Sequence, residues 1–164
     1  MSKGEPSVGR QRRQARIAAV QALYQIELND GSAGAVVDEF ATYRLHGEDG
    51  KARADTALFA DLVNGCTTRQ GEVDSLVADA LDKDRKLERL EILMRAILRA
   101  GTYELLARDD IDDALTISEY VGVADAFFNE REPALVNAVL DRVARGLAGR
   151  DTTAEAAHGV TQDG

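Results

Sequence analysis

The feature of this sequence that most constrains its fold is an apolar stripe of helical spacing in the second half of the chain. The stripe recurs at intervals of three and four residues, so its members share one face of a helix. They are Leu90, Leu93, Met94, Ile97, Leu98, Gly101 and Leu105. A helix over residues 87–108 with such a face must be covered there by other helices. Glycine costs about 1 kcal/mol of helix propensity relative to alanine, so we expect a neighbouring helix to approach Gly101 closely.

Similar apolar patterns predict further helices over residues 10–28, 33–45 and 114–128, and a last helix that follows Pro133. Residues 54–81 carry two apolar runs, which predict either one long helix or two helices that meet at residues 67–71. No segment alternates with the period of a strand, and no fixed-period repeat is present. The chain is 45% hydrophobic and has two prolines and no tryptophan, so we predict an all-α fold of six or seven helices.

The length of 164 residues favours a single domain. Residues 1–9 contain Gly, Pro and Ser and predict a flexible basic lead, and residues 10–148 form the expected helical domain. Residues 149–164 are small and polar and predict a disordered tail.

In the first predicted helix, residues 10–28, the apolar residues share one face, so we expect Tyr24 to pack in the core. They are Ile17, Val20, Tyr24 and Leu28.

Charge is unevenly distributed along the chain. Residues 1–16 hold five basic residues and one acidic residue, whereas the rest of the chain holds 15 basic and 28 acidic residues. The first segment therefore has a net charge of +4 and the remainder −13, within a total of −9. Such asymmetry indicates a local nucleic-acid-binding arm on a body that repels nucleic acid elsewhere.

The positive charge comes mainly from four arginines that begin the first helix: Arg10, Arg12, Arg13 and Arg16. Guanidinium groups match phosphate oxygens two at a time and also stack on bases. At a helix N-terminus these like charges repel each other, and bound phosphate would relieve the repulsion. We expect replacement of these arginines to leave folding intact, because the apolar face begins only at Ile17. A basic end that merely aids solubility is the alternative interpretation.

Residues typical of catalysis or metal binding are scarce. His46 lies in a polar loop and His158 in the expected tail, and Cys66 falls on an apolar helix face. The acidic run at residues 109–113 lacks the glycine and closing glutamate of a calcium loop, and no glycine-rich phosphate loop occurs. We therefore predict no enzymatic activity, no cofactor and no metal. No signal peptide or membrane span is evident, so the predicted location is the cytoplasm.

Three segments, taken in order, resemble the NusB family of transcription antitermination factors. They are residues 12–28 with Gln-Ala-Leu-Tyr at 21–24, residues 95–106 with Tyr-Glu-Leu, and residues 116–145 with Ile-Ser-Glu and Val-Asn-Ala-Val-Leu-Asp. The resemblance implies two packed helical subdomains and pairing with NusE, a small-subunit ribosomal protein. It also implies binding of boxA RNA in nascent ribosomal RNA leaders, so that RNA polymerase, contacted indirectly, elongates past terminators.

The resemblance also assigns residues to surfaces. Positions matching the family's RNA-binding surface are Arg10, Arg12, Arg13, Arg16, Tyr24 and Arg99. Positions near the RNA and partner surfaces are Glu130, Arg131 and Leu135, in a stretch where this chain departs from the family pattern by having Ala134-Leu135 in place of Lys-Phe. Two alternatives stay open: a detached NusB-like domain related to RNA cytosine methyltransferases, and a purely structural helical module. A homodimer also stays open, since an apolar face serves a second copy as well as a core.

Overall fold

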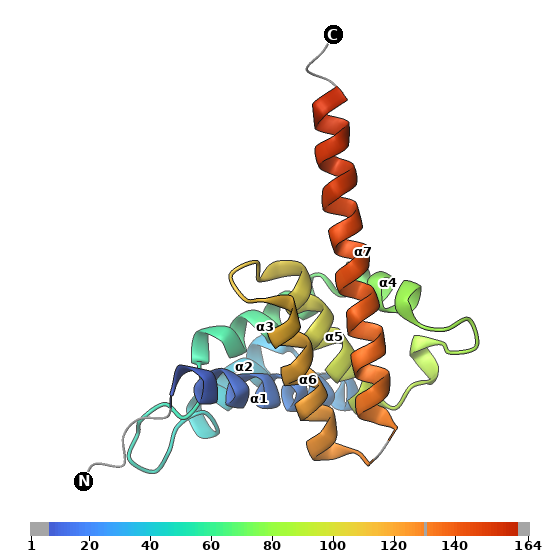
Figure 1. Ribbon diagram of the computed structural model, residues 1–164. Coiled ribbons are helices and arrows are strands. Elements are labelled where there is room, and N and C mark those ends of the chain that lie inside the picture. Colours follow the sequence, from blue (N-terminus) through green and yellow to red (C-terminus); the bar gives the residue numbers. More distant parts are fainter. Residues whose placement is uncertain (1–6, 130, 161–164) are drawn as a thin grey trace.

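The structure is a computed structural model that describes the backbone of residues 7–129 and 131–160, and the side chains of residues 7–129 and 131–150 (Figure 1). Seven α-helices and one 3-10 turn make up these described residues. They are α1 (Val8–Asn29), α2 (Ala33–Tyr43), α3 (Thr56–Thr68), α4 (Gln70–Ala80), the 3-10 turn η1 (Leu87–Arg89), α5 (Ile92–Ala107), α6 (Asp113–Phe127) and α7 (Glu132–Val160). The predicted all-α fold is confirmed.

Polar side chains fix where the first helices begin. Ser7, Ser32 and Asp55 precede α1, α2 and α3, and each side chain accepts a hydrogen bond from the backbone N–H three residues later, at 2.9 to 3.4 Å. Such caps satisfy amide groups that the first turn of a helix leaves without partners. At the other end of α1, Asp30 adopts a left-handed conformation (φ 51°) that turns the chain toward α2.

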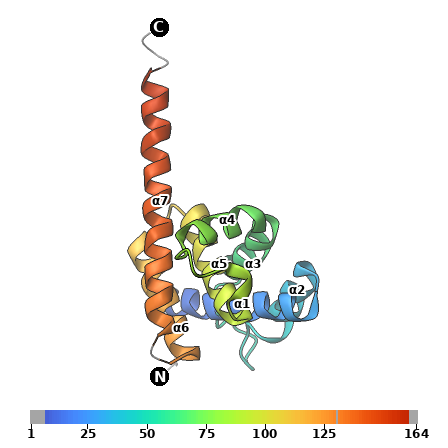
Figure 2. The ribbon, with the colours of Figure 1, turned by 90° about the vertical axis from the view of Figure 1, so that its right-hand side faces the viewer.

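The helices form two groups that meet at α5. Helices α1, α2 and α3 pack on one another, and α4, α6 and α7 pack around the other side of α5 (Figures 1 and 2). Helix α5 contacts α1 and α3 as well as α4, α6 and α7, so a continuous core runs through both groups. This arrangement places the N-terminal half of α1 beside α6, which matters for the charged residues described below.

Close packing at Gly101 confirms the expectation drawn from its place on the apolar stripe. A Cβ atom on Gly101 would lie 2.8 Å from Cδ1 of Leu140 in α7 and 3.3 Å from Cδ2 of Tyr120 in α6. Helices α6 and α7 therefore rest almost directly on the backbone of α5. The missing side chain is what allows this approach, and it offsets the lower helix propensity of glycine.

The sequence left the division of residues 54–81 open and predicted the start of a later helix at the wrong residue. Residues 54–81 form two helices, which break at Arg69. The predicted helix over 87–108 begins only at Ile92, after the turn η1 and an extended Leu90. The reason is local: Arg95 donates to the carbonyl oxygens of Glu88 (3.1 Å) and Leu90 (2.7 Å), which satisfies these groups outside a helix.

The ends of the chain also differ from expectation. Helix α7 extends beyond the other helices and continues to Val160 (Figure 1), so the backbone of residues 149–160 is helical where a disordered tail was predicted. Three of these twelve residues are alanine, and a helix that packing has already nucleated adds further residues more easily than a new helix forms. Residues 161–164 of the predicted tail and 1–6 of the predicted lead lie outside the described residues, and Val8 and Gly9 belong to α1. Among the helices described, none is long and apolar enough to span a bilayer.

Candidate nucleic-acid interface

The core face of α1 is not the face that the sequence indicated. Tyr24 is 37% exposed and Leu28 is 54% exposed, so the prediction that Tyr24 packs in the core was wrong. The buried side is built largely from alanines, namely Ala15, Ala18, Ala19 and Ala22, together with Arg16, Val20 and Leu23. The small alanine side chains let α1 lie close to α3 and α5. The buried side of α1 is therefore its alanine side and not the side that carries the bulkier Tyr24 and Leu28.

Three of the four arginines remain at the surface of the first turns of α1. Arg10 is exposed and has no side-chain ion pair among the described residues. The Arg12 side chain is 32% exposed, and its Nε lies 3.9 Å from Asp55 Oδ2, which is too far for a hydrogen bond. The Arg13 side chain is 60% exposed. Together Arg10, Arg12 and Arg13 form what we call the arginine face.

Arg13 is paired with an acidic residue of α6. Its Nε and one terminal nitrogen donate to the two carboxylate oxygens of Glu119, at 3.1 and 3.2 Å. These hydrogen bonds and the negative charge of Glu119 raise the pKa of Arg13. The pair joins the N-terminal end of α1 to the middle of α6 at the protein surface.

Arg16 is buried, which corrects its assignment to the RNA-binding surface. Its side chain is 2% exposed and donates three hydrogen bonds, of 2.7 to 3.1 Å, to the fully buried carboxylate of Glu104 in α5. Tyr120 of α6 donates its hydroxyl to the same carboxylate at 2.8 Å. The three side chains, which we call the buried network, join α1, α5 and α6. Arg16 cannot meet a phosphate without leaving Glu104 uncompensated, so we expect its replacement to destabilise the fold.

The electrostatics of the buried network follow from this pairing. Burial alone lowers the pKa of Arg16, but the hydrogen bonds and charge of Glu104 outweigh this, so the pKa is raised. Burial, together with the neighbouring Glu104, raises the pKa of Tyr120 well above its usual value near 10. The sequence contained a signal for this network, since Glu104 stands between Gly101 and Leu105 on the apolar side of α5. A buried acid requires a buried cation or hydrogen-bond donors.

Arg99 is likewise occupied inside the protein. Its Nε and one terminal nitrogen bind Asp74 of α4 at 2.8 and 3.1 Å, and its other terminal nitrogen binds Glu27 of α1 at 3.2 Å. The side chain is 14% exposed. Arg95 also donates to Glu27. These contacts tie α5 to α1 and α4, so the Arg99 guanidinium already has carboxylate partners on both helices.

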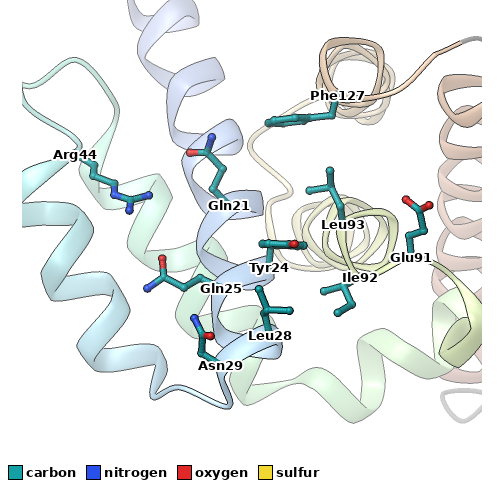
Figure 3. A pocket seen from close by; sticks show the side chains of 10 residues that line it. All are labelled: Gln21, Tyr24, Gln25, Leu28, Asn29, Arg44, Glu91, Ile92, Leu93 and Phe127. Atoms are coloured by element: carbon teal, nitrogen blue, oxygen red, sulfur yellow. The ribbon is translucent and has the colours of Figure 1, made fainter.

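Tyr24 instead lines a shallow groove of about 670 Å³ at the C-terminal end of α1 (Figure 3). Its apolar lining comes from three helices: Tyr24 and Leu28 of α1, Ile92 and Leu93 of α5, and Phe127 of α6. Polar side chains stand around these, including Arg44 on one side and Glu91 on the other (Figure 3). We call this surface the apolar groove. Because Tyr24, Leu28 and Phe127 are all at least 37% exposed, it is a site suited to another molecule.

The predicted partner residues lie at the start of α7. Arg131 is exposed and lines a second hollow with Asp125, Phe128 and Glu132. Leu135 is half-buried and packs against the core. Glu130 lies outside the described residues. The hollow borders the junction of α6 and α7.

Groups that might support catalysis are dispersed. Cys66 is buried in α3, and burial raises the pKa of its thiol to about 12, so it stays protonated. His46 is exposed, and its Nδ1 lies 3.0 Å from the carbonyl oxygen of Ala41. Within the part of the chain that the structure describes, no three His, Cys, Asp or Glu side chains gather in a way that would hold a metal ion.

Comparison with known proteins settles the family. A sequence model of the NusB family matches residues 13–145. The chain belongs to the NusB family. The transcription antitermination protein NusB of Sinorhizobium fredii (strain NBRC 101917 / NGR234) is 48% identical over 142 residues, which are 85% of this chain and 89% of that protein. The NusB protein of Agrobacterium fabrum (strain C58 / ATCC 33970) is 46% identical over 150 residues, 88% and 91% of the two chains.

Solved structures match the fold as well. T. maritima NusB is 30% identical, with a TM-score of 0.69 over 82% of this chain and 90% of that chain. A chain in the crystal structure of the antitermination factors NusB and NusE in complex with double-stranded RNA has a TM-score of 0.71 over 84% of this chain and 98% of that chain. At 22% identity the latter match supports the fold alone. This NusB-family chain is therefore a transcription antitermination factor and not an enzyme, as predicted.

Proposed function

We propose that this chain binds boxA RNA of nascent ribosomal RNA leaders together with NusE, in the cytoplasm, and contacts RNA polymerase only indirectly. The observation that carries the proposal is the arginine face, which places the exposed Arg10 and Arg13 and the half-buried Arg12 on the first turns of α1 in a protein of net charge −9. Phosphate oxygens are the ligands that such a cluster binds best. The methyltransferase-domain alternative is less favoured, because the relatives that match over about nine-tenths of their length are antitermination proteins.

The structure reduces the RNA-binding set from the one that the sequence suggested. Arg10, Arg12 and Arg13 stay in the proposal, whereas Arg16 and Arg99 leave it because Arg16 binds a buried carboxylate and Arg99 binds two half-buried ones. Tyr24 is exposed and belongs to the proposed partner site. Three arginines on an acidic protein give only a short electrostatic contact, so RNA binding by this chain alone should be weak.

The apolar groove is the proposed binding surface for NusE. Its exposed tyrosine, phenylalanine and leucine side chains, surrounded by polar residues, have the composition of a protein interface core with a polar rim. Arg13 and Tyr24 are 11 residues apart on α1, which is about 16 Å along a helix. RNA held by the arginine face would therefore run close to a partner seated in the groove. Arg131 and Leu135, which the family resemblance assigns to this neighbourhood, extend the proposed surface toward α7.

The test of this proposal is a fluorescence titration of a boxA RNA with the chain alone and with NusE present. We expect weak binding alone and tighter binding with NusE, because the partner adds contacts along the same RNA. Equal affinities would contradict the pairing. A second copy of this chain is the competing occupant of the apolar groove, and self-association that NusE fails to displace would contradict the assignment of the groove.

A triple alanine variant of the arginine face tests the RNA contacts. Each lost contact to a single-stranded phosphate removes roughly 0.7 from the slope of log affinity against log salt, so three lost contacts remove about 2 and weaken binding roughly 100-fold near 0.1 M salt. The matched control replaces Arg85, Arg89 and Arg145, which are exposed elsewhere and carry the same charge. If both variants lose the same RNA affinity, the arginine face has no specific role in RNA binding. The alternative that the chain is a purely structural helical module would then be favoured.

A further inference from the structure

One of the two edges through which the Arg13 guanidinium can bind a phosphate is already occupied. A guanidinium binds a phosphate in bidentate fashion through two neighbouring N–H groups. In this structure Arg13 uses its Nε and one terminal nitrogen on Glu119, at 3.1 and 3.2 Å. Arg12 makes only a 3.9 Å contact to Asp55, and Arg10 makes no ion pair among the described side chains. Among the three arginines of the arginine face, only Arg13 donates two hydrogen bonds to a carboxylate.

Glu119 is placed so that it can lose Arg13 at little cost. Its side chain is 14% exposed, and Oε2 lies 3.9 Å from a terminal nitrogen of the buried Arg16. If Arg13 turns away toward solvent, the charge of Glu119 is still compensated by Arg16 and by the water that reaches its exposed edge. Arg13, whose side chain is 60% exposed, has room to turn. An exchange of carboxylate for phosphate is therefore possible without leaving an unpaired buried charge.

We infer that Glu119 is a built-in competitor of RNA, in that its carboxylate holds the Nε edge of Arg13 and offsets its charge, so a backbone phosphate that binds through this edge must displace it. The inference rests on the proposed RNA-binding function and adds to it a residue that sets the affinity of the arginine face. The competition lowers RNA affinity and favours RNA that also engages Arg10 and Arg12, because several phosphates together offset the lost ion pair. Glu119 itself touches no RNA in this account.

The expected size of the effect follows from what an exposed ion pair contributes. Such pairs stabilise a protein modestly, so their loss on binding should weaken RNA affinity about two- to fivefold. The opposite role is that Glu119 holds Arg13 in a productive orientation. The two roles predict opposite signs when Glu119 is neutralised, which makes them easy to separate.

The experiment measures affinity for a fluorescein-labelled boxA RNA by anisotropy, with NusE present, for the wild-type chain, E119Q, R13A and the double variant. We expect E119Q to bind about two- to fivefold more tightly than wild type, and E119Q to change affinity little in the R13A background. D113N is the matched control, because Asp113 is an exposed acid of the same helix with no ion pair among the described residues. It separates the specific effect from the general loss of one negative charge. Thermal unfolding of each variant checks that the fold persists.

The possible outcomes distinguish this inference from the proposed function. E119Q that binds as wild type does, or more weakly, overturns the competitor role even though RNA binding stands. E119Q and D113N that tighten binding equally also overturn it, because charge alone then explains the change. A wild-type chain that fails to bind the RNA contradicts the proposed function and the inference with it. An R13A variant that binds as well as wild type overturns the role of Arg13 and therefore the inference, while the proposed function stands.

Discussion

Arg13 and Arg16 stand three residues apart on one helix, and the two serve opposite purposes. Arg13 lies at the surface and pairs with Glu119, whereas Arg16 lies in the interior and binds Glu104 with Tyr120 beside it. The two positions differ by about 60° around the axis of α1, which is enough to place one side chain at the edge of α6 and the other beneath it. A basic run in a sequence therefore need not be a single surface.

The contrast also concerns energy. The exposed pair sits in a high-dielectric setting and contributes little to stability, while the buried pair is surrounded by protein and cannot lose one partner without leaving a buried charge. The interior arginine thus supports the stability of the domain, and the surface arginine can exchange its carboxylate partner for another anion. The following predictions test this division.

The largest effect is expected when the buried network is broken. Arg16→Met leaves the Glu104 carboxylate buried without its cation and should lower the free energy of unfolding by about 3–5 kcal/mol. Arg13→Met, the matched surface change, should lower it far less, because the Arg13 side chain is 60% exposed and water screens its charge. Urea unfolding of both variants measures the difference. R16M combined with E104Q should recover part of the loss, since no buried charge remains; equal stabilities of R16M and R13M would remove the distinction between the two arginines.

A smaller effect is expected at the third member of the network. Tyr120→Phe removes the hydroxyl that donates to Glu104 at 2.8 Å, and a hydrogen bond to a charged group contributes about 1.5–3 kcal/mol. Tyr43→Phe is the control, because Tyr43 is 78% exposed and its replacement should change stability very little. Urea unfolding of the two variants gives the comparison. If Y120F is as stable as Y43F, Tyr120 does not support the Arg16–Glu104 pair.

The smallest effect is expected in the pH dependence of stability. Because the pKa of Tyr120 is raised in the folded chain, the folded tyrosine keeps its proton at pH values where the unfolded tyrosine loses it. Stability is thus fully present below about pH 10 and falls above it, by up to about 1.4 kcal/mol per pH unit from this group. Y120F should show a shallower decline than wild type between pH 10 and 11. Parallel declines would show that Tyr120 titrates in the same way in both states.

The sequence predicted most of the helices, because the spacing of apolar residues along a segment depends on that segment alone. Apolar spacing reports which side of a helix can be buried, and the stripe from Leu93 to Leu105 correctly indicated a central helix with Gly101 at a close contact. It failed where a side-chain hydrogen bond overrides the apolar spacing, as at Leu90, where Arg95 binds the carbonyl group and delays the start of α5. It also failed in α1, because alanines pack more closely than the bulkier residues that define an apparent apolar face.

The sequence predicted the kind of residue that forms the candidate site, but not which of these residues lie at the surface. Arg10 and Arg13 are exposed and Arg12 is half-buried, whereas Arg16 is buried and Tyr24 lines the apolar groove. Nothing within α1 distinguishes Arg13 from Arg16, since both are arginines in the same basic run. Glu104, 88 residues away from Arg16, was the missing partner.

By itself, then, the sequence determined the helical class, the family and the presence of an N-terminal cluster of positive charge, because composition and periodicity are properties of neighbouring residues. Tertiary structure alone decided which arginines face solvent, which carboxylates hold them, and that Tyr24, Leu93 and Phe127 meet in one groove. Those outcomes depend on how α1, α5 and α6 pack. The packing sets which charges lose their water, and therefore which must find a partner inside the protein.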